Sequence, residues 1–481
     1  MCQHYRRGAD LTEVSYIKID RGRRPRLQPI GRDRHGAAYF YHRWQRWSHG
    51  VTRFMKTPCH ANRREFLRTG SGLAAAAWLT GFARPTARSF AAVPPSDAIR
   101  IGHIGVGNQG GNNLKALMPH TVAVCDVDSV RLAAAKERVE KATGRPCAAY
   151  SDYRQMLDSR DVDAVVVTVP DHWHALITVD ACRAGKDVYC EKPLSLTIAD
   201  GRAMVDAARK SERIVQTGSQ QRSDARFRLA CELVRSGRLG KVHTVRAGIS
   251  DVNFKGPPVA DSAPPPELDY DFWLGPAPAK PYNEKHVHYN FRFFWDYSGG
   301  QLTNWGAHNL DIAQWGLGTD DTGPIEITGR ARYHAQGWYE VPEWSEVVYK
   351  YANGVTILCG QDHPGGTEFE GPKGKIHVNR KQLRSDPPEL IEQALTESDV
   401  HLEESDDHHA NWLAAIRSRK LPICDVEIGH RSATVCHLGN IALRTGRPIR
   451  WDPEREAVIG DDEAQAMVAR PYRAPWNLNT T

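Results

Sequence analysis

The 481-residue chain is predicted to be an α/β protein with two domains. A helix-covered parallel sheet is expected over residues 97–220, and an α+β domain with an open-faced, largely antiparallel sheet over residues 221–450. Two observations predict this division. From residue 98, short apolar runs alternate with helical segments, which is typical of βαβ units and of a parallel sheet. Beyond residue 325, apolar runs follow one another with only short turns between them, which favours antiparallel pairing.

Six apolar runs are the predicted strands of the first domain. They are AIRIGHIGV, TVAVC, CAAY, VDAVVVTV, KDVYC and RIVQTG, and helical segments are expected between them at 109–118, 129–142, 174–185 and 197–211. A continuous apolar run such as VDAVVVTV indicates a strand that is buried on both faces of its sheet.

The second domain begins with a predicted helix at 224–236 and a strand at 241–250. Residues 251–298 are rich in proline and aromatic residues and are expected to form a long, partly ordered loop. A helix at 302–317 follows, and the next predicted strands are IEITGRARYH, SEVVYKYA, GVTILCGQ and GKIHVN. Helices at about 405–418 and 428–444 close the domain, and residues 451–481 form a tail rich in tryptophan and proline.

The formal net charge of +6 comes from the N-terminal part of the chain. Residues 1–54 hold 12 Lys/Arg and 4 Asp/Glu, residues 55–91 hold 6 and 1, and the rest therefore carries −7. A mildly acidic body lacks the positive charge that nucleic-acid binding requires, so nucleic acid is not expected as a partner.

Residues 55–91 have the pattern of a twin-arginine export signal. The segment RREFL at 63–67 contains the paired arginines, and a short apolar run of small residues follows at 72–82. Ser89 and Ala91 fit the −3 and −1 positions of a cleavage site. We therefore expect a periplasmic or otherwise exported protein that uses the twin-arginine export machinery. The alternatives are a soluble amphipathic helix and an uncleaved membrane anchor, although the run is shorter than the roughly 20 residues that span a bilayer.

Met55 begins a stretch that resembles an ordinary signal-peptide start. Residues 1–54 are rich in arginine and lack apolar periodicity. We therefore expect translation to begin at Met55, and residues 1–54 to be disordered and absent from the native protein.

The ten cysteines form no CxxC pair and show no His/Cys spacing typical of a metal site. Several, including Cys125 and Cys359, fall within predicted strands, where a buried free thiol is the ordinary state. A disulfide framework and a structural zinc site are therefore not expected, and the proposed chemistry needs no metal.

The segment GHIGVGNQGGN carries a Gly105-x-Gly107-x-x-Gly110 motif between the first strand and the first helix. Such glycines allow a tight turn, close approach of the backbone to a pyrophosphate, and close helix–strand packing. Asp126 ends the second strand, where a carboxylate accepts hydrogen bonds from ribose hydroxyls and repels a 2′-phosphate, and Asp128 adds to that repulsion. The motif predicts a Rossmann dinucleotide site that prefers NAD(H) to NADP(H). Asn108 and Gln109, within the loop, are included among the cofactor-binding residues.

Four features together resemble the Gfo/Idh/MocA oxidoreductases. They are EKP at 191–193, TVPDHWHA at 168–175, GGQLTNWGAHNLDIAQW at 299–315, and the order of a Rossmann domain followed by an open-faced sheet domain. The resemblance covers about residues 97–450. It is specific for the family and weakly specific for the substrate.

The resemblance implies roles for individual residues. Lys192 would contact the substrate hydroxyl and the nicotinamide ribose, and His308 would be the general acid/base. Glu191 would help to fix the loop and the cofactor. The residues expected to line the cofactor near its nicotinamide end are Thr168, Pro170, Trp173 and His174. A homo-oligomer formed through the second-domain sheet is also expected.

The helical motif departs from the family at Asn304, where an aspartate is frequent. Asparagine can bind a substrate hydroxyl but carries no charge, so we expect the pKa of His308 to be less elevated than in relatives. Asn304, His308 and Asp311 are spaced i, i+4 and i+7, which places them on one helix face. Asp311 is a candidate to bind substrate or to orient the His308 ring, and the alternative is a structural interaction at the helix end.

Further candidates come from position along the chain. Arg292 and Tyr297 precede the catalytic helix and could hydrogen-bond a polyol, although the aromatic residues around them could equally be core. Gln220 follows the sixth strand, at the sheet edge where open α/β sheets bind ligands. The Lys192–Pro193 peptide is predicted to be cis, since an X–Pro linkage makes that form accessible.

The predicted activity is hydride transfer between NAD(H) and a carbinol carbon of a sugar, polyol or glycoside, with a cofactor that is tightly bound and recycled in place. One alternative is an NAD-dependent glycosidase that acts by transient oxidation and elimination. The other is a non-catalytic sugar- or nucleotide-binding member of the family. Intact Lys192 and His308 favour an enzyme.

Overall fold

The computed structural model describes residues 98–253 and 257–478. The predicted signal at 55–91 and the segment 1–54 lie outside the described residues. Within the described part of the chain, none of the helices combines the length and the apolar composition that a membrane crossing requires.

Six strands form the first sheet, in the order β3-β2-β1-β4-β5-β6, and every neighbouring pair is parallel. The strands are β1 (Ile101–Ile104), β2 (Thr121–Cys125), β3 (Ala148–Tyr150), β4 (Ala164–Val167), β5 (Asp187–Cys190) and β6 (Val215–Thr217). This is the strand order of the doubly wound dinucleotide-binding fold, whose ligand site lies where the order reverses, between β1 and β4. The predicted Rossmann fold is confirmed.

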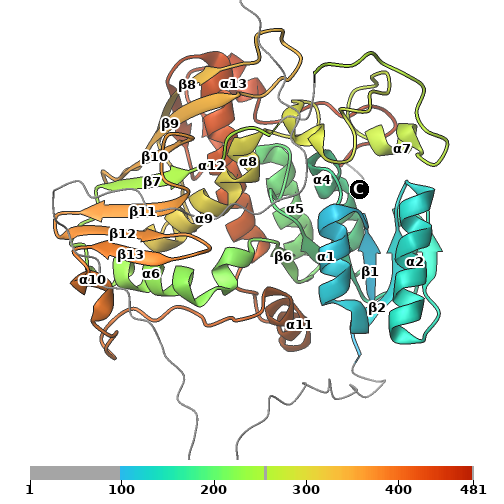
Figure 1. Ribbon diagram of the computed structural model, residues 1–481, viewed down its shortest axis with the longest axis horizontal. Helices are drawn as coiled ribbons and strands as arrows, with labels where there is room; N and C mark the ends of the chain where they lie inside the picture. Colours follow the sequence, from blue (N-terminus) through green and yellow to red (C-terminus); the bar gives the residue numbers. More distant parts are fainter. Residues whose placement is uncertain (1–97, 254–256, 479–481) are drawn as a thin grey trace, which may run out of the picture. The chain divides into compact units, whose positions relative to one another are not determined.

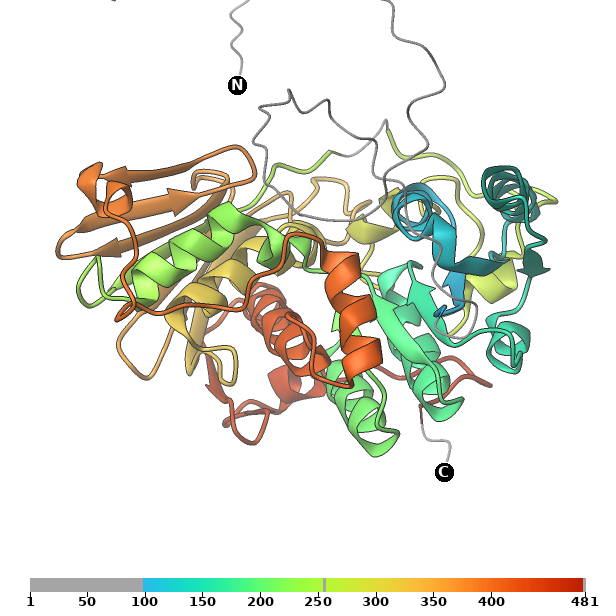
Figure 2. The same cartoon turned by 90° about the horizontal axis from the view of Figure 1, so that it is seen from below.

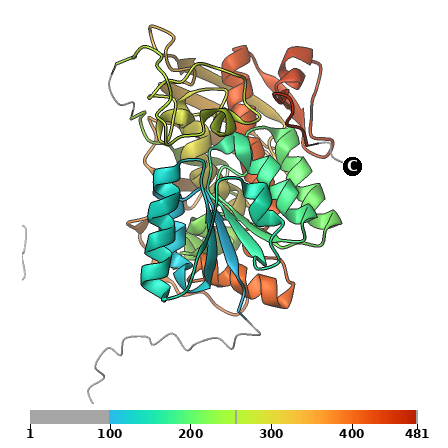
Figure 3. The same cartoon turned by 90° about the vertical axis from the view of Figure 1, so that its right-hand side faces the viewer.

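Helices cover both faces of this sheet, with α1 and α2 on one side and α4 and α5 on the other (Figure 3). The helices of this domain are α1 (Asn108–Ala116), η1 (Met118–His120), α2 (Ser129–Thr143), α3 (Tyr153–Leu157), α4 (Asp171–Arg183) and α5 (Ile198–Lys210). Asp128 caps α2 by accepting hydrogen bonds from the backbone N–H groups of Val130 and Arg131, and left-handed Gly144 ends the helix.

Nine strands form the second sheet, in the order β13-β12-β11-β7-β10-β9-β8-β14-β15. The strands are β7 (Thr244–Gly248), β8 (Glu326–Arg332), β9 (Trp344–Lys350), β10 (Thr356–Gly360), β11 (Gly366–Gly371), β12 (Gly374–Val378), β13 (Leu383–Asp386), β14 (Ile449–Asp452) and β15 (Ala457–Val458). Strands β7 and β10 are parallel and the other neighbouring pairs are antiparallel, which agrees with the predicted, largely antiparallel sheet.

One face of this sheet is covered by helices α6, α9 and α12 (Figure 1). The helices of the second half are η2 (Gln220–Ser223), α6 (Ala225–Arg235), α7 (Tyr270–Leu274), η3 (Asn290–Phe293), α8 (Gln301–Asn304), α9 (Gly306–Leu317), α10 (Glu389–Glu392), α11 (His408–Ser418), α12 (Val426–Thr445) and α13 (Asp462–Ala466). Helix α12 contacts α5 as well as β8 and β9, and thereby joins the two sheets. The other face of the sheet carries charged pairs such as Arg330–Glu346 and Lys350–Glu326.

The C-terminal segments return to the first domain. Helix α11 lies beside the parallel sheet (Figure 2), where fully buried Trp412 packs in one apolar cluster with Ile101 and Tyr189. The backbone N–H of Thr217, in β6, donates to the Cys424 carbonyl at 2.9 Å. The boundary predicted near residue 220 therefore separates the two sheets, but residues 408–424 belong structurally to the first. The region predicted as a tail, residues 451–481, also contains the end of β14, as well as β15 and α13.

Candidate active site

A cavity of about 680 Å³ lies at the carboxyl ends of the parallel strands. Its walls come from the loops after β1, β2, β4 and β5, from α8 and α9, and from a segment that crosses over the nucleotide-binding domain. We call this segment, residues 267–294, the strap. Sixteen sequence-predicted residues line the cavity, namely Gly105, Gly107, Asn108, Gln109, Gly110, Asp126, Thr168, Pro170, Trp173, His174, Glu191, Lys192, Gln220, Arg292, Asn304 and His308.

The glycine loop has the geometry that a dinucleotide requires. A Cβ on Gly105, whose φ is +82°, would lie 2.3 Å from the Thr168 carbonyl oxygen. A Cβ on Gly110 would lie 2.1 Å from the Gly105 carbonyl oxygen, so α1 packs against the loop only because both positions lack side chains. Gly107 is the N-cap of α1 and supplies no side-chain cap, which leaves N–H groups of the first turn available to a pyrophosphate. The residues present therefore fit a dinucleotide.

Asp126 lies beside this loop, at the end of β2. Its carboxylate accepts hydrogen bonds from the backbone N–H groups of Val106 and Asp128, at 2.9 and 3.0 Å. Burial raises the pKa of Asp126, and these two hydrogen bonds oppose the change. Arg131, which the sequence analysis missed, lines the same end of the cavity and pairs with the Asp128 carboxylate at 3.4 Å.

The strap is held to the nucleotide-binding domain at this end. The backbone N–H of Ser129 donates to the Glu267 carbonyl at 2.9 Å, and that of Asp269 donates to the Val127 carbonyl at 3.0 Å. Further along, the Trp273 carbonyl accepts a hydrogen bond from the indole N–H of Trp173 at 2.9 Å. The loop predicted at 251–298 is thus ordered over its second half, and it covers the cavity.

Lys192 lies at the other end of the cavity. Its Nζ donates to the backbone oxygen and to Oδ1 of Asn304, at 3.1 and 3.0 Å, which couples the loop after β5 to α8. Burial lowers the pKa of Lys192 to about 8, although the neighbouring carboxylates of Glu191 and Asp171 oppose the change. The Lys192–Pro193 peptide is cis, as predicted.

Glu191 connects three elements around the cofactor cleft. Its Oε1 accepts hydrogen bonds from Asn113 Nδ2 at 3.0 Å, Gln220 Nε2 at 3.2 Å and Gln109 Nε2 at 3.3 Å. A buried carboxylate with these amide donors holds α1, η2 and the loop after β5 in one arrangement. This geometry agrees with the expectation that Glu191 fixes the loop.

His308 is the third residue of α9, and it is 6% exposed. Burial lowers its pKa well below the ordinary value, and the nearby cations Lys192 and Arg380 lower it further. The imidazole is therefore neutral near pH 7. Its Nδ1 has no hydrogen-bond partner among the described residues, so the expected contact with Asp311 is not present.

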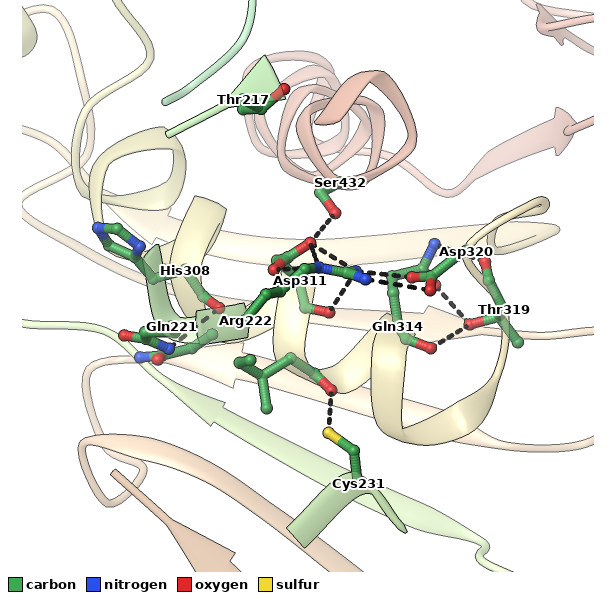
Figure 4. Close-up of polar contacts among 12 residues, drawn as sticks. Thr217, Gln221, Arg222, Cys231, His308, Asp311, Gln314, Thr319, Asp320 and Ser432 are labelled. Carbon is green, nitrogen blue, oxygen red and sulfur yellow. Dashed lines mark hydrogen bonds and ion pairs between the residues drawn. The ribbon is translucent and has the colours of Figure 1, made fainter. Parts of the chain in front are cut away.

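The Asp311 carboxylate lies outside the cavity lining and is bound to Arg222 instead (Figure 4). Arg222 Nε and an Nη atom donate to its two oxygens at 2.9 and 2.8 Å, and Ser432 Oγ donates at 2.7 Å. The substrate-binding and ring-orienting roles predicted for Asp311 do not fit this geometry. Asp311 is a structural residue because α9 turns this position toward η2 and α12.

Three other predicted residues make contacts that the sequence analysis did not anticipate. Tyr297 is fully buried, packs 5.0 Å from the Trp273 ring and lies outside the cavity lining, so its predicted contact with substrate is not supported. Trp173 supports the strap through its indole N–H. The two ring nitrogens of His174 lie 2.8 and 3.0 Å from the carbonyl oxygens of Pro193 and Val169. Burial opposes the charged ring, but Cys190, Asp171 and the Pro193 carbonyl together raise the pKa of His174 to about 10 and favour its cationic form.

Several lining residues were not predicted from the sequence. They are Arg131 on α2, the strap residues Phe272, Trp273, His288, Tyr289 and Phe291, Trp305 between α8 and α9, and Arg380 in the β12–β13 turn. The aromatic and proline content of 251–298 was a signal for the strap residues. Arg380 had no local signal, because its place in the site depends on the pairing of β12 with β11.

The fold and the site together define a two-domain protein with a dinucleotide-binding site of the Rossmann type. Residues 99–219 match the model of an oxidoreductase family described as its NAD-binding Rossmann fold, and residues 248–478 match the model described as its C-terminal alpha/beta domain. The chain belongs to the Gfo/Idh/MocA oxidoreductase family.

Individual relatives match part of the chain. A myo-inositol 2-dehydrogenase from Thermotoga maritima is 36% identical over 178 residues, which are 36% of this chain and 48% of that protein. An alpha-N-acetylgalactosaminidase from Shewanella oneidensis is 25% identical over 178 residues, 34% of this chain and 39% of that one. The aligned segment thus spans about half or less of either relative.

Solved structures extend the likeness to both domains. The WlbA dehydrogenase from Bordetella pertussis, in complex with NADH and UDP-GlcNAcA, has a TM-score of 0.55 and 20% identity. It covers 74% of this chain and 99% of its own. At this identity the likeness describes the fold.

Proposed function

We propose that the protein transfers a hydride between NAD(H) and a carbinol carbon of a sugar, polyol or glycoside. The observation that carries the proposal is that Lys192, Asn304 and His308 lie in the same cavity as the glycine loop. A proton-transferring group and a cationic donor therefore lie where a substrate hydroxyl would meet the nicotinamide end of the dinucleotide. The dinucleotide, when bound, supplies the hydride acceptor or donor.

Three residues of the chain would transfer the proton, stabilise the developing charge and position the substrate. Neutral His308 removes the hydroxyl proton during oxidation and returns it during reduction. Lys192 donates a hydrogen bond to the same oxygen and stabilises its negative charge as the proton leaves. Asn304 holds the Lys192 ammonium through two acceptors, and its Nδ2 donates to Gln301 Oε1 at 2.9 Å, which leaves one amide N–H for a substrate hydroxyl.

NAD(H) is the proposed cofactor in preference to NADP(H). The Asp126 carboxylate accepts two backbone hydrogen bonds, keeps lone pairs for ribose hydroxyls and lies close to the Asp128 carboxylate. Two carboxylates disfavour a 2′-phosphate. The cation of Arg131 would favour a 2′-phosphate, but its charge is paired with that of Asp128.

Export through the twin-arginine route is part of the proposal, as is a periplasmic location of the mature protein. The periplasm supplies little free NAD, so an exported enzyme benefits from a cofactor that stays bound. The strap, which bonds to the turn after β2 and to Trp173, supports such retention. A redox-neutral cycle would then oxidise one sugar and reduce another in the same site.

A glycosidase is the second candidate. The alpha-N-acetylgalactosaminidase relative favours it, since transient oxidation followed by elimination and reduction also returns the cofactor to its starting state. The intact Lys192 of the EKP segment favours the dehydrogenase. Incubation with aryl glycosides distinguishes the two, because only the glycosidase releases the aglycone.

The deciding experiment follows NAD(H) absorbance with a panel of sugars, polyols and glycosides. We expect turnover by the parent protein, and a loss of about 10²–10⁴-fold in Lys192→Ala and His308→Ala. Lys420→Ala, which removes an exposed lysine after α11, is the matched control and should retain activity. Parent-like rates in both site variants would show that the catalytic assignment is wrong.

A further inference from the structure

Two arginines face the substrate end of the cavity without a carboxylate partner. Arg292 comes from the strap and Arg380 from the β12–β13 turn, and both line the cavity with Lys192 and His308. Among residues 98–253 and 257–478, neither arginine forms an ion pair. By contrast, buried Arg222, close behind the site, is neutralised by Asp311 and Asp320. Unpaired guanidinium groups in a cavity are available to a ligand.

Both arginines are held where they are by contacts that leave donor atoms free. Arg380 lies over the Trp305 ring at 5.0 Å and uses its Nε to donate to Gln221 Oε1 at 3.1 Å. Arg292 lies over the Tyr289 ring at 4.1 Å. Aromatic stacking orients a guanidinium plane and keeps its N–H groups at the edge, where they can form paired hydrogen bonds with an oxyanion.

The side chains that line the substrate end of the cavity carry a net positive charge. The carboxylates that line the cavity are Asp126, Asp171 and Glu191, and Asp126 lies at the far end, beside Arg131. Near the reaction centre, Glu191 balances Lys192, and buried Asp171 lies close to cationic His174. Arg292 also lies near Asp171, but that carboxylate already faces His174 and Lys192, and no lining carboxylate remains for Arg380. The nicotinamide ring of NAD⁺ would add another positive charge to the same end.

We propose that the substrate is a sugar that carries an oxyanion, and that Arg380, with Arg292, binds this group. The chemistry fits a uronate carboxylate and equally an ester sulfate or phosphate, since each presents two or more oxygens to a guanidinium. Arg380 is exposed and Arg292 is half-buried, so a neutral polyol would leave both guanidinium groups bound to water and would gain no paired, charge-assisted hydrogen bonds from them. This inference rests on the proposed function, because it concerns the same cavity and the same reacting hydroxyl.

Binding to the NADH-loaded protein tests the inference separately from turnover. Isothermal titration would compare glucose, galactose and mannose with their uronates, 6-sulfates and 6-phosphates. We expect at least one anionic sugar to bind about 10-fold or more tightly than its neutral partner. Comparison of the uronates, 6-sulfates and 6-phosphates then identifies which anionic group the protein binds. If no anionic sugar binds more tightly than its neutral partner, the inference is wrong.

Matched variants connect the preference to Arg380. In Arg380→Gln the anionic and neutral sugars should bind with affinities within about 3-fold of each other. Arg384→Gln removes the same charge from an exposed position on the same β-hairpin and should keep the preference. An undiminished preference in both Arg380→Gln and Arg292→Gln would also overturn the assignment.

The absorbance assay with the same sugars separates the two proposals. Tight binding of an anionic sugar with no absorbance change of the bound dinucleotide, in either its NAD⁺ or its NADH form, would contradict the oxidoreductase function and leave the binding inference intact. Turnover of neutral sugars, with no preference for anionic ones, would support the function and overturn the inference.

Discussion

At the residue scale, the site depends on the hydrogen bond between Lys192 and Asn304. Burial lowers the pKa of Lys192 to about 8, so its ammonium form is present at neutral pH and is lost as the pH rises through this value. If the cationic form assists the reaction, kcat/KM should fall above about pH 8. His308 does not cause a fall in kcat/KM over this pH range, because its pKa lies well below the ordinary value and the imidazole stays neutral.

Asn304→Asp should move this falling limb upward. A carboxylate 3.0 Å from Nζ favours the ammonium form and should raise the pKa of Lys192 by about 1 to 3 units. The pH dependence of kcat/KM measures the change. Asn353→Asp, in the exposed β9–β10 turn, introduces the same charge outside the cavity and should leave the limb in place. A limb that is unchanged in Asn304→Asp would show that another group produces it.

At the element scale, buried Arg222 joins η2 to α9. Removing its guanidinium leaves fully buried Asp311 without its counter-ion, and Asp320 loses a partner at 2.7 Å. Arg222→Met should therefore lower the free energy of unfolding by about 3–5 kcal/mol, as measured by urea denaturation. Arg226→Met, which breaks a partly exposed pair with Asp224, should lower the free energy of unfolding far less. Similar losses in the two variants would contradict a special role for the buried pair.

The strap depends on a glycine next to Trp173. Gly275 has φ +48°, and a Cβ there would lie 2.0 Å from a Trp173 ring atom. Gly275→Ala should displace either the strap or the indole, and weaken NADH binding by about 10-fold in a fluorescence titration. Gly337→Ala imposes similar backbone strain at φ +64° with no neighbour within 4 Å, so it controls for strain alone. Equal affinities in the two variants would show that the strap does not support the cofactor.

Elements were predictable where the chain carries a local pattern. The parallel strands are continuous apolar runs, whereas β11, GTEFEG, has a single large apolar residue, Phe369, and was not predicted. Lys192 and His308 lie in contiguous motifs that identify them directly. Asp311 lies on the same helix face as His308 by spacing. Spacing along one helix, however, contains no information about Arg222, which belongs to η2 and forms an ion pair with Asp311. Arg380 reaches the site only through strand pairing, and nothing near it in the sequence indicates this.

At the scale of the whole molecule, the uncovered face of the nine-stranded sheet is the expected oligomer contact. Leu358 lies on this face, paired with Val348 on one side and Arg246 on the other. Leu358→Lys would place a second cation beside Arg246 and should convert a homo-oligomer into a smaller species, measured by light scattering after gel filtration. Leu421→Lys, at a leucine that is 60% exposed elsewhere, should leave the mass unchanged. An unchanged mass in Leu358→Lys would argue that this face is not the contact.

The C-terminal segment packs against both the strap and the nucleotide-binding domain. Trp476 packs 4.9 Å from Trp173, and the backbone N–H of Arg473 donates to the Pro276 carbonyl at 2.9 Å, so the end of the chain supports the strap from outside. Release of a dinucleotide would require these contacts to open together. We therefore expect the purified protein to retain about one dinucleotide per chain after gel filtration, identified by mass spectrometry of the acid-released nucleotide. Trp476→Ala should lower the retained fraction, whereas Trp344→Ala, on the uncovered face of the sheet, should not. A parent protein that is free of dinucleotide, yet turns over with added NAD, would contradict a closed redox cycle and favour an enzyme that exchanges its cofactor.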